Sequence, residues 1–92
     1  MDKALRIRID GRVQGVGFRY WAFKQASILG LGGWVRNEAD GSVLIECEGS
    51  SEDVDNFVSR LRRGPPGARI DRVETREIEA GVPRRDFTIK FQ

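Results

Sequence analysis

The chain has 92 residues, the size of one compact domain, and its 33% charged and 39% hydrophobic residues exclude a disordered or fibrous chain. Sixteen basic and 14 acidic residues leave a net charge of +2, which is weak support for a nucleic-acid partner. No apolar run approaches the roughly 18–20 residues of a membrane span, and the first residues form no signal-peptide core. We therefore expect a single cytoplasmic domain over residues 1–92, with no membrane partner.

The reactive side chains exclude several classes of enzyme. The chain contains no histidine and one cysteine, Cys47, so zinc sites and the Ser-His-Asp and Cys-His nucleophile systems lack an essential part. Acidic residues follow Cys47 closely, and negative neighbours raise a thiol pKa rather than lower it. We interpret Cys47 as a buried strand residue.

A strand, a glycine-rich turn and a helix are the first predicted elements. Leu5, Ile7 and Ile9 alternate with polar residues, which is the period of a strand with one buried face. Residues 11–17 are rich in glycine, whereas residues 18–29 contain neither glycine nor proline and predict a helix that stops at Gly30. The expected core positions of this helix are Ala22, Gln25 or Ala26, and Leu29.

Two strands joined by a hairpin come next. Residues 31, 33, 35 and 37 share one face of a strand that ends at Asn37. The pair Asp40-Gly41 then predicts a tight hairpin turn. The return strand has its buried face at Val43, Ile45 and Cys47.

The second helix is the clearest element in the sequence. Ser50 offers an N-cap hydroxyl with a carboxylate three residues later, and the glycines and prolines of residues 64–67 end the helix. Its apolar positions at i, i+3, i+4 and i+7 are Val54, Phe57, Val58 and Leu61. Residues 70–78 then predict a strand whose irregular alternation indicates a bulge, residues 81–83 a loop, and Phe87, Ile89 and Phe91 a short last strand.

The order β-α-β-β-α-β-β predicts an α+β, ferredoxin-like split βαβ fold with a short additional C-terminal strand. Right-handed crossovers place both helices on one face of a mixed antiparallel sheet. The first two strands are parallel in such a fold, so their carboxyl ends lie at the same edge. We expect the glycine-rich turn with Arg19 to lie beside Asn37 at that edge.

The glycine-rich turn is a candidate anion site. Gly11, Gly15 and Gly17 allow positive φ and a close approach of backbone to ligand, and the turn opens into a helix N-terminus. Arg19, in the first helical turn, adds a charged fork. The turn lacks the Lys-Ser/Thr pair of a Walker A loop and the glycine spacing of a dinucleotide fingerprint. The alternative is a tight turn with a solvent-facing arginine.

Two segments resemble the signatures of the acylphosphatase family. Gly11-Arg12-Val13-Gln14-Gly15-Val16-Gly17-Phe18-Arg19 is similar to the first, and Gly33-Trp34-Val35-Arg36-Asn37, followed by Gly41, Val43 and Gly49, to the second. The resemblance implies hydrolysis of the carboxyl-phosphate bond of small acyl phosphates, without metal, cofactor or phosphoenzyme. It also implies that Arg19 binds the phosphate and that Asn37 positions the attacking water.

The chemistry agrees with that implication. The departing carboxylate is a weak base, so positioning and charge stabilisation can be sufficient. The expected phosphate-binding loop is Gln14, Gly15, Val16, Gly17, Phe18 and Arg19, whose amides and guanidinium would hold the phosphoryl oxygens. Inorganic phosphate or sulfate should compete for the same amides. The alternative for Asn37 is a turn residue that caps its own backbone.

Other residues and functions stay open as alternatives. Arg12 and Arg36 are interpreted as solvated strand-end charges, Trp21 and Trp34 as packing residues, and no serine nucleophile is proposed at Ser42 or Ser50. Nothing in the motifs contacts the acyl end of a substrate. The competing functions are a non-catalytic ferredoxin-like anion- or RNA-binding module and an acylphosphatase-like domain of a larger enzyme. We expect a monomer.

Overall fold

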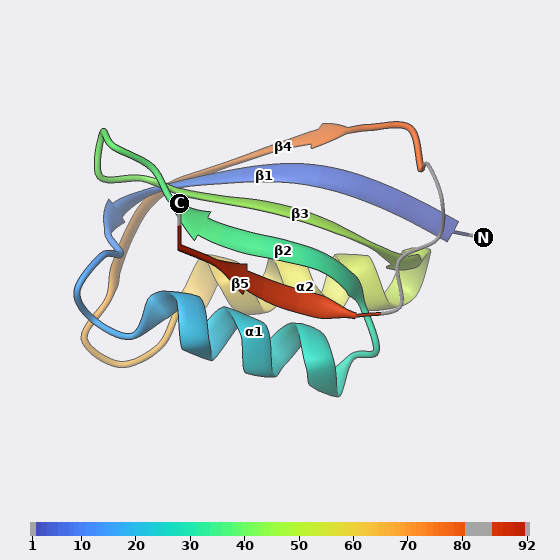
Figure 1. The fold of residues 1–92 in the computed structure, drawn as a ribbon, viewed down its shortest axis with the longest axis horizontal. Helices are drawn as coiled ribbons and strands as arrows, with labels where there is room; N and C mark the ends of the chain where they lie inside the picture. The colour runs from blue at the N-terminus through green and yellow to red at the C-terminus, as the bar shows by residue number, and fades with distance from the viewer. Residues whose placement is uncertain (1, 81–85, 92) are drawn as a thin grey trace.

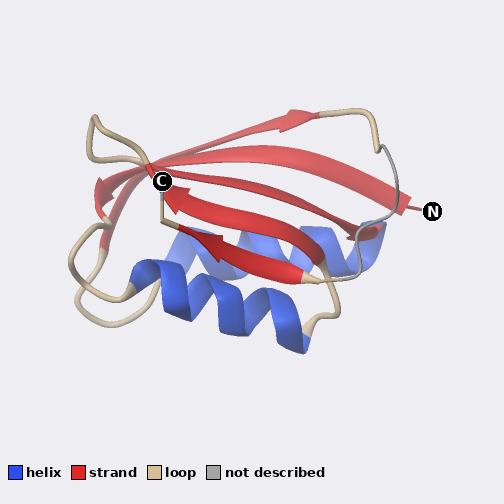
Figure 2. Ribbon diagram, in the orientation of Figure 1, coloured by secondary structure: helices blue, strands red, loops and turns tan. Residues whose placement is uncertain are grey.

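A five-stranded sheet with both helices on one face forms the molecule (Figures 1 and 2). The computed structural model describes residues 2–80 and 86–91, so the loop predicted at residues 81–83 lies outside the described residues. The elements are β1 (Asp2–Arg12), α1 (Phe18–Ile28), β2 (Gly32–Asn37), β3 (Val43–Ser50), α2 (Ser51–Arg63), β4 (Arg69–Glu77) and β5 (Phe87–Lys90). The strand order is β4-β1-β3-β2-β5, with only the β2–β5 pair parallel among these neighbours. The predicted ferredoxin-like α+β fold is confirmed.

The core lies between the sheet and the two helices. Alternate residues of β1 and β3 face it and are fully buried, as the period-two pattern predicts. Cys47 is one of them, which confirms its interpretation as a buried strand residue. From the helices, α2 contributes Val54, Phe57 and Leu61 to this core, while Val58 packs at its margin.

The N-cap of α2 is present as predicted. The Ser50 hydroxyl accepts a hydrogen bond from the Asp53 amide at 3.1 Å. Glu52 and Asp53 place negative charge in the first turn, where it interacts favourably with the partial positive charge of the helix N-terminus. The helix ends at Arg63, and its C-cap Gly64 has a φ of +69°, a positive value that glycine adopts easily.

The buried face of α1 confirms the predicted Ala22 and Ala26 but differs from the prediction at its two ends. Its buried residues are Phe18, Ala22 and Ala26, so the stripe begins one turn earlier than expected. The helix ends at Ile28, and Leu29 is the C-cap and only half-buried. The helix carries apolar side chains on several faces, which made its core face ambiguous in the sequence.

The hairpin between β2 and β3 is also wider than predicted. Residues 38–42 form a five-residue loop closed by bonds from the Glu38 amide to the Ser42 carbonyl, 2.9 Å, and from the Gly41 amide to the Glu38 carbonyl, 3.2 Å. The Asp40 carboxylate accepts hydrogen bonds from both the amide and the hydroxyl of Ser42, at 2.9 and 2.6 Å. These local bonds hold Ser42 in the turn, so β3 begins only at Val43.

The bulge expected in the fourth strand is present. Asp10 pairs with Arg72 and Gly11 with Ile70, so Asp71 of β4 has no opposing residue on β1. Gly11 has a φ of +139°, and a Cβ there would collide with the Arg69 carbonyl oxygen. Glycine is therefore required where β1 bends toward the following loop.

The register of the sheet brings the carboxyl ends of β1 and β2 to the same edge, with β3 between the two strands. Both strands pair antiparallel with β3, and Val43 lies opposite Ile9 on one side and Asn37 on the other. The last residue of β2 is therefore level with Ile9, three residues before the end of β1. The loop that leaves β1 and the start of α1 lie at this same edge of the sheet (Figure 1).

Candidate active site

The loop between β1 and α1 presents an open helix N-terminus. Gly15 and Gly17 both have φ of +77°, and a Cβ at either position would stand in open space. Glycine is needed there for its conformation rather than for close packing. Gly17 is the N-cap of α1 and offers no side-chain acceptor to the first amides of the helix.

The two helix N-termini of the molecule differ in charge. The first turn of α2 contains two acidic residues and a serine cap, whereas the first turn of α1 contains no acidic residue and includes Arg19. The partial positive charge at the start of α1 is therefore not neutralised by its own side chains. This end of the sheet favours an anion.

Arg19 projects from α1 toward the end of β5. Its guanidinium carbon lies 4.7 Å from the centre of the Phe91 ring, and its Nη1 donates a long hydrogen bond of 3.5 Å to the Lys90 carbonyl. Within residues 2–80 and 86–91, no carboxylate lies within ion-pair distance of Arg19. The guanidinium is thus oriented by weak contacts and keeps donors for a ligand.

Asn37 closes the other side of this region. Its side-chain Oδ1 is buried and accepts no hydrogen bond from any residue that the structure describes. A buried polar atom without a partner is uncommon and indicates a place for a ligand or water. The alternative in which Asn37 uses this oxygen to cap its own backbone is therefore wrong.

A pocket of about 290 Å³ brings these features together. Its lining residues are Val13, Gly15, Gly17, Phe18, Arg19, Tyr20, Asn37, Ile89 and Phe91. Of the predicted site residues, Arg19, Asn37, Gly15, Gly17 and Phe18 line it, whereas Gln14 and Val16 do not. The predicted neighbourhood of Arg19 and Asn37 is thus present in the structure.

The apolar part of the wall was missed from the sequence. Tyr20 and Phe91 are large hydrophobic side chains with 60% and 81% of their surface exposed, and Ile89 lies beside them. Exposed aromatic side chains of this size next to a charged group are a feature of ligand sites. Their clustering depends on β5 lying beside α1, which no local pattern in the sequence predicts.

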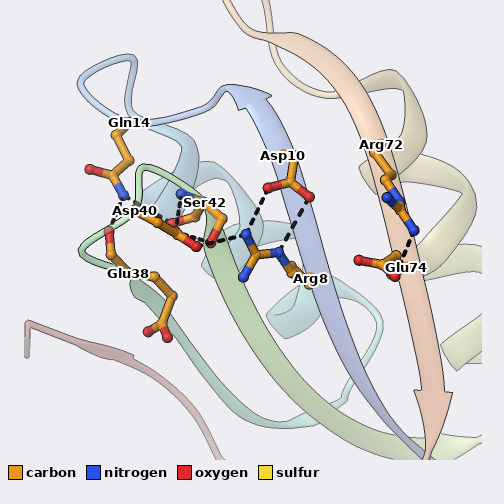
Figure 3. A network of polar contacts seen from close by, with 8 residues as sticks. All are labelled: Arg8, Asp10, Gln14, Glu38, Asp40, Ser42, Arg72 and Glu74. Carbon is orange, nitrogen blue, oxygen red and sulfur yellow. Dashed lines mark hydrogen bonds and ion pairs between the residues drawn. The ribbon is translucent and has the colours of Figure 1, made fainter.

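The Gln14 side chain points toward the loop between β2 and β3 (Figure 3) and does not line the pocket. Its Nε2 donates hydrogen bonds of 2.8 Å to the Glu38 carbonyl and 2.9 Å to the Ser42 carbonyl. Gln14 therefore contributes at most its backbone to an anion site. Its side chain connects the two loops.

Arg36, interpreted as a solvated strand-end charge, is instead half-buried and paired, whereas the two tryptophans and two serines have the structural contacts expected of them. Arg36 forms a 2.7 Å ion pair with Glu38 and lies over the Trp34 ring, which is only 8% exposed. Trp21 packs against Phe18 with ring centres 5.5 Å apart. The Ser42 hydroxyl donates to the Asp40 carboxylate within the loop, and Ser50 caps α2, so both hydroxyls have structural partners and neither serine lines the pocket.

The titration of two groups is shifted by their surroundings. Burial raises the pKa of the Cys47 thiol to about 12, which leaves it protonated and unreactive near neutral pH. Hydrogen bonds from Ser42, followed by the bond from Arg8, lower the pKa of Asp40 well below its ordinary value.

No group of three His, Cys, Asp or Glu side chains suited to a metal ion occurs in the described part of the chain. None of its helices is long and apolar enough to cross a membrane.

Comparison with known proteins identifies the family. The acylphosphatase family model matches residues 5–89. An acylphosphatase of Rhizobium etli is 50% identical over 88 residues, covering 96% of this chain and 94% of the relative. The chain belongs to the acylphosphatase family, whose members hydrolyse acyl phosphates. The alternative of a non-catalytic binding module is not favoured.

Solved structures agree with this assignment. The crystal structure of acylphosphatase from Bacillus subtilis superposes with a TM-score of 0.92 at 37% identity, covering 98% of this chain and 99% of that chain. Full-length HypF, solved in a phosphate- and nucleotide-bound form, contains a similar unit with a TM-score of 0.86 and 34% identity, covering 98% of this chain but 12% of that chain. The same domain thus occurs by itself and within a longer chain.

Proposed function

We propose that this family member holds the transferring phosphoryl group with backbone amides of residues 14–19 and the guanidinium of Arg19, and that the Asn37 side chain positions the attacking water. The observation that supports these roles is the pocket lined by Gly15, Gly17, Arg19 and Asn37 together. The Oδ1 of Asn37 has no hydrogen-bond partner among the described residues, so this side chain, which lines the pocket, is not committed to the protein through that oxygen.

The reaction needs no protein base. Water attacks phosphorus opposite the acyl oxygen, the bond from phosphorus to that oxygen breaks, and the bonding pair leaves with the carboxylate. A proton of the attacking water passes to an oxygen of the phosphoryl group, so the products are a carboxylate and inorganic phosphate. Asn37 is neutral at working pH and orients the water, while the amides and Arg19 stabilise the charge on the equatorial oxygens.

Two further parts of the proposal concern small ligands. Inorganic phosphate and sulfate compete with substrate, because they share its tetrahedral anionic end. Catalysis requires neither metal nor cofactor, since Arg19 and the start of α1 provide the positive charge and the carboxylate leaves without protonation. The aromatic and aliphatic wall of the pocket lies where the acyl group would emerge.

We also propose that the protein is one domain that acts as a cytoplasmic monomer. The buried, unpaired Cys47 suits a reducing compartment, where thiols persist. Sedimentation equilibrium at micromolar concentration would test the monomer.

Turnover of benzoyl phosphate, with p-nitrophenyl phosphate as the comparison substrate and a chelator present in both assays, tests the proposed function. We expect hydrolysis of the acyl phosphate and little or none of the monoester, because p-nitrophenolate is a stronger base than benzoate and therefore a poorer leaving group. Failure to hydrolyse benzoyl phosphate would overturn the function. Activity that appears only when Mg²⁺ or Zn²⁺ replaces the chelator would overturn the metal-free mechanism.

A further inference from the structure

The Gln14 side chain contacts both ends of the loop between β2 and β3. One hydrogen bond goes to the carbonyl of Glu38, the first residue of the loop, and the other to the carbonyl of Ser42, the last. Glu38 follows Asn37 directly. The residue that begins the anion loop is therefore bonded to the residue next to Asn37.

Glutamine is the side chain that this geometry requires. Both acceptors are carbonyl oxygens, so the group between them must donate twice, and one amide nitrogen has two hydrogens for the purpose. Glutamate would place acceptors against acceptors, and asparagine is one methylene shorter. The bonds join segments 24 and 28 residues apart in the sequence.

Other side chains also hold the loop between β2 and β3, but they connect it to a different part of the molecule than Gln14 does. Arg8 of β1 donates to Asp40 at 2.7 Å and to Asp10 at 3.1 Å, while Asp40 holds Ser42 (Figure 3). These contacts connect the loop to the sheet through Asp40. Gln14 alone among these side chains connects it to the glycine-rich turn that lines the pocket.

We propose that Gln14 is a positioning residue: its side-chain amide fixes the base of the β2–β3 loop against the anion loop, and so sets where the Asn37 amide stands relative to the bound phosphoryl group. This inference rests on the proposed role of Asn37. Loss of the two bonds leaves the backbone amides and Arg19 able to bind the anion. The water-orienting group, however, is no longer held at one position.

Gln14→Met and Gln14→Glu test this role, because both keep the length of the side chain and remove its two donors. We expect kcat to fall about 10- to 100-fold, as misplacement of a reacting group by an ångström can cause. KM and the inhibition constant of inorganic phosphate should stay within about twofold. Adding Asn37→Ala to Gln14→Met should lower kcat no further than Asn37→Ala alone, since coupled residues are not additive.

Gln25→Met is the matched control. Gln25 accepts a hydrogen bond of 2.7 Å from Arg60 between the two helices, so its replacement also removes a side-chain bond but lies away from the pocket. We expect a lower melting temperature with unchanged kcat. A kcat loss in Gln14→Met no greater than that in Gln25→Met, or additive losses with Asn37→Ala, would overturn the positioning role.

A measurement without turnover separates this inference from the proposed function. Amide hydrogen exchange in Gln14→Met should accelerate at Glu38 and Gly41, whose amides close the loop, and remain slow in β1 and β3. If the wild type were inactive but Gln14→Met showed this exchange pattern, the proposed function would be refuted and the structural role of Gln14 between the two loops would still be supported. Unchanged exchange at Glu38 and Gly41 would refute the bridge itself.

Discussion

Arg19 and Asn37 differ in how their side chains are held. Arg19 has weak contacts with β5 and keeps several donors, whereas Asn37 is the last residue of β2 and has an unpartnered side-chain oxygen. Several donors suit the oxygens of a phosphoryl group, and a single amide suits the orientation of one water.

Arg19→Gln and Asn37→Ala should therefore impair catalysis in different ways. Arg19 would contact phosphate in the ground and transition states, so its loss should raise KM and lower kcat. Asn37 would contact only the water, so its loss should lower kcat by about 100-fold or more with little change in KM. Steady-state kinetics with benzoyl phosphate measure both, and circular dichroism confirms folding. Near-wild-type kcat in folded Asn37→Ala would contradict the assigned roles.

At the scale of elements, the pocket is lined by the start of α1 with the loop before it, the last residue of β2 and the end of β5. The loop before α1 depends on glycines with positive φ, Gly15 and Gly17. A glycine beyond the other end of α1 offers a comparison. Gly30, just beyond the end of α1, has a φ of +71°, and a Cβ added there would meet open space, much as at Gly17. Only Gly17 lines the pocket.

Gly17→Val should abolish inhibition by inorganic phosphate, whereas Gly30→Val should leave it intact. Both substitutions force a β-branched residue toward positive φ and should cost about 1–3 kcal/mol of stability. Only the valine at position 17 would also crowd the amides at the start of α1. Phosphate inhibition constants and urea denaturation of the two variants measure the contrast. Equal phosphate inhibition in both variants would place the anion elsewhere.

The loop after β2 should lose stability in acid through Asp40. Its pKa is lowered by the bonds from Ser42 and Arg8, so the stabilisation is present above the ordinary carboxyl pKa of about 3.9 and is lost as the pH falls below it. Asp40→Asn should therefore be less stable than the wild type at pH 7, and the difference should shrink below about pH 4. Denaturation curves between pH 3 and 7 measure it. A difference independent of pH would exclude Asp40 as the titrating group.

Across the whole molecule, the elements with one strong local signal could be predicted, and the contacts between distant segments could not. Alternation in β1 and β3 and the Ser50 cap of α2 depend on neighbours in the sequence, and these predictions are confirmed. The buried face of α1 was predicted correctly at Ala22 and Ala26, but Phe18 was missed and Leu29 is only half-buried, because aromatic and apolar residues surround that helix. The five-residue loop depends on the hydrogen bonds of the Asp40 side chain, one of which comes from Arg8 on β1. The apolar wall of the pocket depends on where β5 packs. Both features arise only when the chain has folded.

Phosphate should stabilise the whole domain, because a ligand that binds only the native state raises the free energy of unfolding by RT ln(1 + [L]/Kd). Tenfold excess over Kd gives about 1.4 kcal/mol, which corresponds to roughly 6–11 °C in melting temperature for a domain of this size. Scanning calorimetry with phosphate, against chloride at equal ionic strength, separates binding from screening. Gly17→Val should show no phosphate-specific shift, whereas Gly30→Val should shift as the wild type does. A shift retained in Gly17→Val would mean that Arg19 holds phosphate without the amides of the loop.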